Sequence, residues 1–250
     1  MPKITFMGAG STVFVRKIIG DCMYRESLKN STVALYDIDP ERLNESKTIL
    51  EAFNRNINDS KMKIECFCGV ENRKKALSGA NYVVNAIQVG GYEPSTVIDF
   101  EIPKKFGLRQ TIADTLGIGG IFRALRTIPV MMDFARDMEE VCPDAWFLNY
   151  TNPMAMLSGY MQRYTGVETV GLCHSVQVCS QALLTGLGME DKLEGRKELI
   201  AGINHMAWLL ELKDKNGVDL YPEVKSRVDA YIADPEKKDK VRMEYIKNFG

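Results

Sequence analysis

The stretch KITFMGAGST at residues 3–12 joins an apolar run of strand length to a glycine pair, Gly8 and Gly10. A helical pattern follows, and the next apolar run ends in an acidic side chain, Asp37. Glycines let a backbone turn tightly against a pyrophosphate, and the free amides that follow, from Ser11 onward, stabilise its negative charge. A carboxylate at the end of the second strand accepts hydrogen bonds from both hydroxyls of an adenine ribose. This order predicts a β–α–β unit that binds a dinucleotide through Gly8, Gly10, Ser11 and Asp37.

The kind of dinucleotide follows from the same region. The full motif has a third glycine, which Val13 replaces here, so the glycine pair taken alone also fits an ordinary turn between a strand and a helix. The carboxylate of Asp37 favours NAD over NADP, because it would repel a 2′-phosphate on the ribose. Arg42 offsets that preference if its side chain turns toward the ribose. The sequence therefore predicts an NAD site.

Apolar runs of strand length alternate with segments of helical spacing over the first 175 residues. Such alternation is typical of a parallel sheet whose crossover helices cover both faces. We therefore expect a doubly wound, Rossmann-like α/β domain at residues 1–175. Its strands are expected at residues 3–7, 32–36, 63–67, 82–87, 145–150 and 168–172, and its helices at residues 13–28, 40–58, 121–141 and 154–164.

Two regions depart from that alternation. Residues 88–121 are Gly-rich and too long for a simple crossover, and they contain Arg109 and Asp114, so we expect a functional loop there. After residue 175 the pattern becomes mixed, and we expect the beginning of an α+β domain for substrate and metal at residues 176–250. Its expected elements are a helix at residues 180–187, a strand at residues 208–213, a turn at Asn216–Gly217 and charged helices to the end.

The composition excludes several classes of protein. The 250 residues carry 32 basic and 33 acidic side chains, a formal net charge of −1, which gives no electrostatic reason to bind nucleic acid or a membrane surface. No apolar stretch approaches the roughly 18 residues of a membrane span, and the first strand starts too early for a signal peptide. We expect a cytoplasmic protein with reduced cysteines and a small-molecule partner.

The two histidines of the chain lie where chemistry is expected. His174 follows Cys173 at the carboxyl end of the last predicted strand, the edge at which open parallel sheets bind ligands. His205 comes just before the predicted strand at residues 208–213. A thiolate and an imidazole can hold a divalent cation and leave positions open for substrate oxygens, although sulfur by itself does not select manganese. A buried thiol and two structural histidines remain the alternative.

The motif NYTNP at residues 149–153 follows the fifth predicted strand. Pro153 suits the first turn of a helix, and Asn152 suits the residue that caps it. Because the motif would lie beside the cofactor, the amide of Asn152 is also a candidate for binding sugar hydroxyls.

Six motifs in a fixed order now stand together: GAGS at residues 8–11, DID at 37–39, GGYEP at 90–94, NYTNP at 149–153, GLCHS at 171–175 and GINH at 202–205. This set resembles family 4 of the glycoside hydrolases, the NAD- and manganese-dependent glycosidases. The CHSV sequence at residues 173–176 is similar to the form in its α-galactosidase branch. The resemblance covers essentially the whole chain and implies an α-galactoside substrate.

The resemblance implies a redox route rather than one with two catalytic carboxylates. NAD takes a hydride from C3 of the sugar, a base removes the proton at C2, the group at C1 leaves, water adds and the hydride returns. It also implies that Cys173 and His205 bind Mn²⁺, that His174 is the general acid, and that Asn152 and Asp114 contact the substrate.

Members of this family are longer than this chain, and they usually form dimers or tetramers. The resemblance therefore implies a homo-oligomer and a truncated chain whose C2 base lies beyond Gly250. If this chain is all there is, we expect the metal site and the NAD cleft to form, turnover to be lost and the last helix to expose an apolar face. Two alternatives share the fold: an NAD-dependent dehydrogenase of the lactate or malate type, which would not need Cys173, and an NAD-binding protein without catalytic activity.

Overall fold

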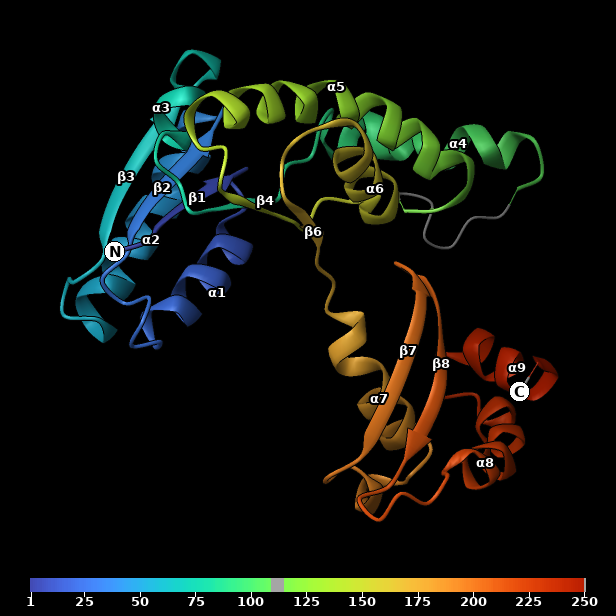
Figure 1. Cartoon of the computed structure of the whole chain (residues 1–250). Helices are drawn as coiled ribbons and strands as arrows, with labels where there is room; N and C mark the ends of the chain where they lie inside the picture. The colour runs from blue at the N-terminus through green and yellow to red at the C-terminus, as the bar shows by residue number, and fades with distance from the viewer. Residues whose placement is uncertain (109–114, 250) are drawn as a thin grey trace. The chain divides into compact units, whose positions relative to one another are not determined.

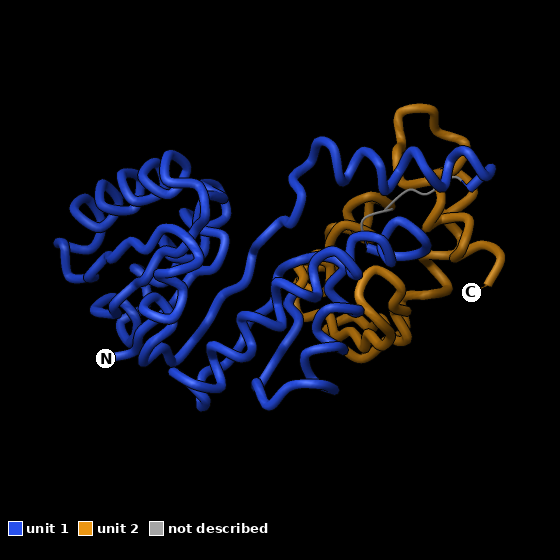
Figure 2. The backbone as a smooth tube through the Cα atoms, turned by 90° about the horizontal axis from the view of Figure 1, so that it is seen from above, with its two compact units in different colours: residues 1–172 blue, residues 173–250 orange. Residues whose placement is uncertain are grey.

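The computed structural model describes residues 1–108 and 115–249 of the chain, which forms two compact units, Met1–Leu172 and Cys173–Gly250 (Figure 2). Each unit is described by itself. The elements of the first unit are β1 (Lys3–Met7), α1 (Thr12–Met23), β2 (Thr32–Asp37), α2 (Pro40–Ile57), β3 (Lys63–Cys68), α3 (Arg73–Leu77), β4 (Tyr82–Asn85), α4 (Val97–Lys105), α5 (Gly117–Val141), β5 (Trp146–Asn149), α6 (Met154–Tyr164) and β6 (Thr169–Gly171).

The first unit is built on one parallel sheet in the order β3-β2-β1-β4-β5-β6. Figure 1 shows α1 and α5 on opposite sides of its strands. One apolar core forms where α1 and α2 cover the sheet, around Phe6, Ile19 and Leu50, and a second where α3, α5 and α6 cover it, around Phe147 and Leu157. The doubly wound, Rossmann-like prediction is therefore confirmed, because buried parallel strands need apolar residues on both faces.

Residues 88–121 are more regular than the predicted loop. A short irregular helix at Gly91–Thr96 leads into α4, and α5 begins at Gly117. The helix was missed because Pro103 lies inside it, and an interior proline lacks the amide that a helical hydrogen bond needs. Helix α1 also ends earlier than predicted, at Met23, after which the backbone continues in turns. Arg109 and Asp114 lie outside the described residues.

The second unit mixes helices with a small antiparallel sheet. Its elements are α7 (Ser175–Gly186), β7 (Lys197–Ile203), β8 (Met206–Lys213), α8 (Tyr221–Ala233) and α9 (Lys240–Phe249). One side of the sheet and the helices enclose a core that contains Leu184, Leu212, Val224 and Met243. Strand β7 was not predicted, because its sequence KELIAGI begins with two charged residues and contains a glycine.

No helix within the described residues is both long and apolar enough to cross a membrane.

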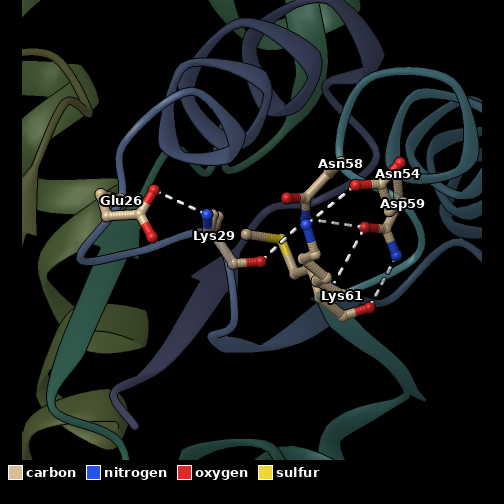
Figure 3. Close-up of polar contacts among 7 residues, drawn as sticks. Glu26, Lys29, Asn54, Asn58, Asp59 and Lys61 are labelled. Carbon is tan, nitrogen blue, oxygen red and sulfur yellow. Dashed lines mark hydrogen bonds and ion pairs between the residues drawn. The ribbon is translucent and has the colours of Figure 1, made fainter.

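Two buried asparagines connect the end of α2 to the residues that precede β2 and β3 (Figure 3). The Asn54 amide donates to the Met62 carbonyl at 2.6 Å and its oxygen accepts from the Met62 amide at 3.2 Å. Asn58 donates to Asn54 Oδ1 at 2.9 Å and to the Lys29 carbonyl at 2.8 Å. The end of α2 is therefore bonded both to the loop before β2 and to the start of β3.

Replacing Asn54 by alanine should lower the free energy of unfolding by about 2–4 kcal/mol, because buried partners lose their hydrogen bonds without access to water. Urea unfolding followed by circular dichroism measures the change. Lys61→Ala is the matched control, since it removes only the exposed ion pair with Asp59 in the same turn. Equal stability of the two variants would contradict a structural role for the asparagines.

Candidate functional site

The turn after β1 requires glycine. Gly8 has φ +86°, and a Cβ on it would lie 2.7 Å from the backbone oxygen of Ala86, just after β4. The amides of Gly8 and Ala9 both donate to the Tyr36 carbonyl, at 3.0 and 2.9 Å, which joins the turn to the end of β2. The carboxyl ends of β1, β2 and β4 therefore meet closely around this turn.

Asp37 points its carboxylate at that turn. Its Oδ2 accepts a hydrogen bond of 2.6 Å from the Gly10 amide, and its Oδ1 accepts one of 3.0 Å from the Asp39 amide. A Cβ on Gly10 would lie 2.9 Å from Oδ2, so the approach needs glycine here too. The structure thus brings together Gly8, Gly10 and Asp37, the residues that the motif predicts to act on one ligand.

A pocket of about 210 Å³ opens next to the glycine turn, between the ends of β1, β4 and β5. At this position the connections from the sheet change direction, since β1 leads to β2 and β3 on one side and β4 leads to β5 and β6 on the other. Open parallel sheets bind ligands in the crevice at such a point. The pocket is lined by Ser11, Phe14, Ala86, Ile87, Gln88, Arg123, Tyr150, Thr151 and Asn152.

The sequence predicted Ser11 and Asn152 as site residues, but it did not predict four other polar side chains of the pocket, those of Gln88, Arg123, Tyr150 and Thr151. Arg123 is 9% exposed on α5. A buried arginine is rare without a charged or polar partner. Arg123 and Arg126, two basic residues in an otherwise apolar stretch of that helix, were the available signal.

A buried polar network supports the wall of the pocket at the end of β5. The Asn85 amide donates to Asn149 Oδ1 and to Thr151 Oγ1, both at 3.0 Å. Asn149 in turn donates to Ser158 Oγ at 3.1 Å and to the Thr151 carbonyl at 3.2 Å, while Thr151 Oγ1 donates to the Ile87 carbonyl at 3.2 Å. Because these side chains are buried and bonded to one another, they fix the backbone next to Asn152.

The helix cap predicted at Asn152 lies one residue later. Helix α6 begins at Met154, so Pro153 is the capping residue rather than part of the first turn, and Asn152 precedes it. Asn152 Oδ1 still accepts a hydrogen bond from the Met154 amide at 3.4 Å. The same oxygen accepts from Thr115 Oγ1 at 3.5 Å. The side chain thus bonds to the start of a helix while it lines the pocket.

In the second unit the structure brings Cys173 and His205 together. The sulfur lies 3.5 Å from Nε2 of His205, which occupies the turn between β7 and β8 with φ +62°. Two ligands of one tetrahedral cation, at about 2.3 Å for sulfur and about 2.1 Å for nitrogen, lie roughly 3.6 Å apart. The pair therefore fits a shared metal ion. Within the described part of the chain no third cysteine, histidine or carboxylate completes a group.

The thiol of Cys173 differs from the other cysteines. Burial raises the pKa of Cys22, Cys66 and Cys179, and it raises the pKa of Cys142 to about 11. Burial acts on Cys173 in the same direction, but hydrogen bonds from Ser175 and Asn204 outweigh it, and the pKa of Cys173 is lowered. A lowered pKa favours the thiolate, which is the form that binds metals.

The remaining predicted residues lie in different places. His174 is exposed at the position before α7, and its carbonyl accepts from the amides of Gln177 and Val178. Asp114 lies outside the described residues. The nucleotide candidates and Asn152 belong to the first unit, whereas Cys173, His174 and His205 belong to the second.

The chain is similar to known proteins in sequence and fold. The chain is 60% identical to an α-galactosidase of Bacillus subtilis over all of its length and 56% of the relative's, and 36% identical to an α-galactosidase of Rhizobium meliloti over 99% and 49%. It thus spans about half the length of the curated relatives it matches. A 6-phospho-α-glucosidase from gut microorganisms, solved with NAD and Mn²⁺, has a TM-score of 0.78 at 21% identity, over 97% of this chain and 57% of that one.

Two family models cover nearly the whole chain. Residues 3–189 match the family 4 glycosyl hydrolases, and residues 200–250 match the C-terminal domain of the same family. The glycine turn with Asp37 and the pair of Cys173 and His205 both fall within the matched ranges. The chain therefore belongs to family 4 of the glycosyl hydrolases.

Proposed function

We propose that this chain acts in the hydrolysis of α-galactosides, with NAD and a divalent metal, Mn²⁺, as cofactors. The contact between Cys173 and His205 carries the proposal, because a thiolate and an imidazole next to each other suit a metal and a dehydrogenase of the same fold has no need of them. The α-galactoside substrate rests on the 60% identity to the Bacillus subtilis α-galactosidase.

The first unit supplies the features that NAD requires. Glycines at the β1 turn leave room for a pyrophosphate, the N-terminus of α1 favours its negative charge, and Asp37 offers the adenine ribose a carboxylate. The pocket is smaller than the roughly 300 Å³ of typical ligand sites, so it suits only one part of the dinucleotide. A structural relative was solved with both NAD and Mn²⁺.

When bound, NAD would supply a hydride acceptor for C3 of the sugar, and the metal would supply positive charge to the oxygens at C2 and C3. The thiolate of Cys173 and the neutral ring of His205 would hold that metal. His174, which is exposed, would donate a proton to the departing oxygen. Asn152 would bind a sugar hydroxyl, and we assign a similar contact to Asp114.

The proposal also covers the domain organisation, the location and the oligomeric state of the protein. Residues 1–175 would form the NAD-binding domain and residues 176–250 the first part of the domain for substrate and metal. We propose a cytoplasmic homo-oligomer. Cys173 has to stay reduced, and the β7–β8 sheet exposes about half of each of five large apolar side chains, Leu199, Ile203, Met206, Trp208 and Leu210.

Hydrolysis of p-nitrophenyl α-galactoside by the purified chain, with NAD, Mn²⁺ and a thiol reductant each omitted in turn, tests this function. Release of nitrophenol should cease without NAD or without Mn²⁺. Hydrolysis that continues without both would contradict the redox route. Absence of hydrolysis in a chain that binds both would contradict catalysis by this chain alone.

Asp37→Ala should weaken NAD binding by roughly 1–3 kcal/mol, because charged hydrogen bonds to the ribose are lost. Calorimetric titration measures the affinity. Glu41→Gln, an exposed carboxyl in the first turn of α2, is the control and should bind NAD as the wild type does. Unchanged affinity of the Asp37 variant would place the ribose elsewhere.

Cys173→Ser should abolish Mn²⁺ binding and leave NAD binding intact, since the thiolate is replaced by a neutral hydroxyl. Electron paramagnetic resonance of free Mn²⁺ gives the affinity. Cys179→Ser, in helix α7, which begins two residues after Cys173, should bind Mn²⁺ normally. A Cys173 variant that keeps its metal affinity rules out the thiolate as a ligand.

His174→Ala should reduce hydrolysis of natural galactosides more than that of aryl galactosides, because only poor leaving groups need protonation. The ratio of kcat/KM for the two substrate types reports the effect. Equal losses on both would remove the role of general acid.

A further inference from the structure

The backbone that leaves β4 is held by a buried ion pair. Asp99, in the first turn of α4, is 1% exposed, and Arg126 of α5 approaches it with two parallel hydrogen bonds. Nη1 donates to Oδ1 at 3.1 Å and Nη2 donates to Oδ2 at 2.6 Å. The Nε of the same guanidinium donates to the Val89 carbonyl at 3.1 Å. One side chain thus fixes α4, α5 and the segment after β4 relative to one another.

The local backbone is adapted to this guanidinium. Gly90 has φ +84°, and a Cβ on it would collide with the side chain of Ser95 and lie 3.2 Å from Cδ of Arg126. On the other side of the turn, Gln88 Nε2 donates to the hydroxyl of Thr96, which is buried, at 3.1 Å. The turn therefore has bonded contacts to both α5 and the residue that precedes α4.

This segment is also one wall of the pocket. Ile87 and Gln88, which directly precede Val89, line the pocket, whereas Arg126 and Asp99 do not. Arg123, three residues before Arg126 and hence on the same face of α5, lines the pocket as well. Helix α5 therefore contributes Arg123 to the pocket lining and, through Arg126, also binds the segment after β4 that forms another part of the lining.

We propose that Arg126 and Asp99 are positioning residues for the dinucleotide: they hold the wall formed by residues 87–89 in its binding position and do not touch the ligand. This role rests on the proposed NAD site. The fixed fork of arginine is essential to it, because one planar guanidinium serves Asp99 and Val89 at the same time. A binding wall held in place in advance lowers the ordering cost of binding.

The first unit contains a comparable ion pair that has no hydrogen bond to the pocket wall, and it can serve as a control. Arg73 of α3 pairs with Asp137 of α5 at 2.5 Å between Nε and Oδ2, and these side chains are 12% and 11% exposed. Both pairs join a neighbouring helix to α5, and both are largely buried, but neither Arg73 nor Asp137 lines the pocket or bonds to its wall. Loss of Arg73 therefore measures the structural cost of breaking such a pair.

Calorimetric titration with NAD and thermal unfolding of the purified chain test the role, with Arg126→Gln, Arg126→Lys and Arg73→Gln. Both glutamine variants should unfold at lower temperature than the wild type. Arg126→Gln should bind NAD about tenfold more weakly, and Arg73→Gln should bind it as the wild type does. Arg126→Lys keeps the charge beside Asp99 but lacks the fork, so it should remain impaired in NAD binding while it recovers stability.

Two results would overturn the positioning role: wild-type NAD affinity in both Arg126 variants, or an equal loss of affinity in Arg73→Gln. If Arg126→Gln fails to fold, the NAD affinity of Arg126→Lys alone tests the positioning role: a weaker affinity supports it and a wild-type affinity overturns it. A wild-type chain that does not bind NAD would instead contradict the proposed nucleotide site itself, and the positioning role with it.

Discussion

The contact between Gly8 and the backbone of Ala86 is the constraint on which the nucleotide site depends. A Cβ on Gly8 would lie 2.7 Å from the Ala86 oxygen, so only hydrogen fits between the end of β1 and the end of β4. This closeness sets the glycine turn directly beside the crevice at the switch point of the sheet. Asp37, the pocket and the pocket wall at residues 87–89 all lie around the contact between Gly8 and Ala86.

The two units contribute different chemistry. The first offers backbone amides, one carboxylate and a pocket supported by buried amide side chains, which suits recognition of a dinucleotide. The second offers a thiol with a lowered pKa and an imidazole 3.5 Å apart, which suits a divalent cation. The proposed redox chemistry on a sugar would need both, because the hydride acceptor and the charge that stabilises the developing oxyanion are separate functions.

Much of this could be predicted from the sequence, since buried parallel strands and a glycine turn leave local patterns. The strand at Lys3–Met7 and the helix at Met154–Tyr164 match the predicted ranges. Strand β7 and helix α4 left weaker patterns, because charged residues, glycine and proline interrupt them. The pairing of Arg126 with Asp99 has no local pattern at all: it depends on two helices that come together only in the folded chain.

The central claim is that the crevice beside Asp37 binds NAD. Titration of the purified chain with NAD and, separately, with NADP tests it most directly, because the 2′-phosphate is the only difference between the two ligands. If Asp37 binds the ribose, NAD should bind at least about tenfold more tightly than NADP, because the carboxylate repels the 2′-phosphate. Equal affinity, or tighter binding of NADP, would contradict it.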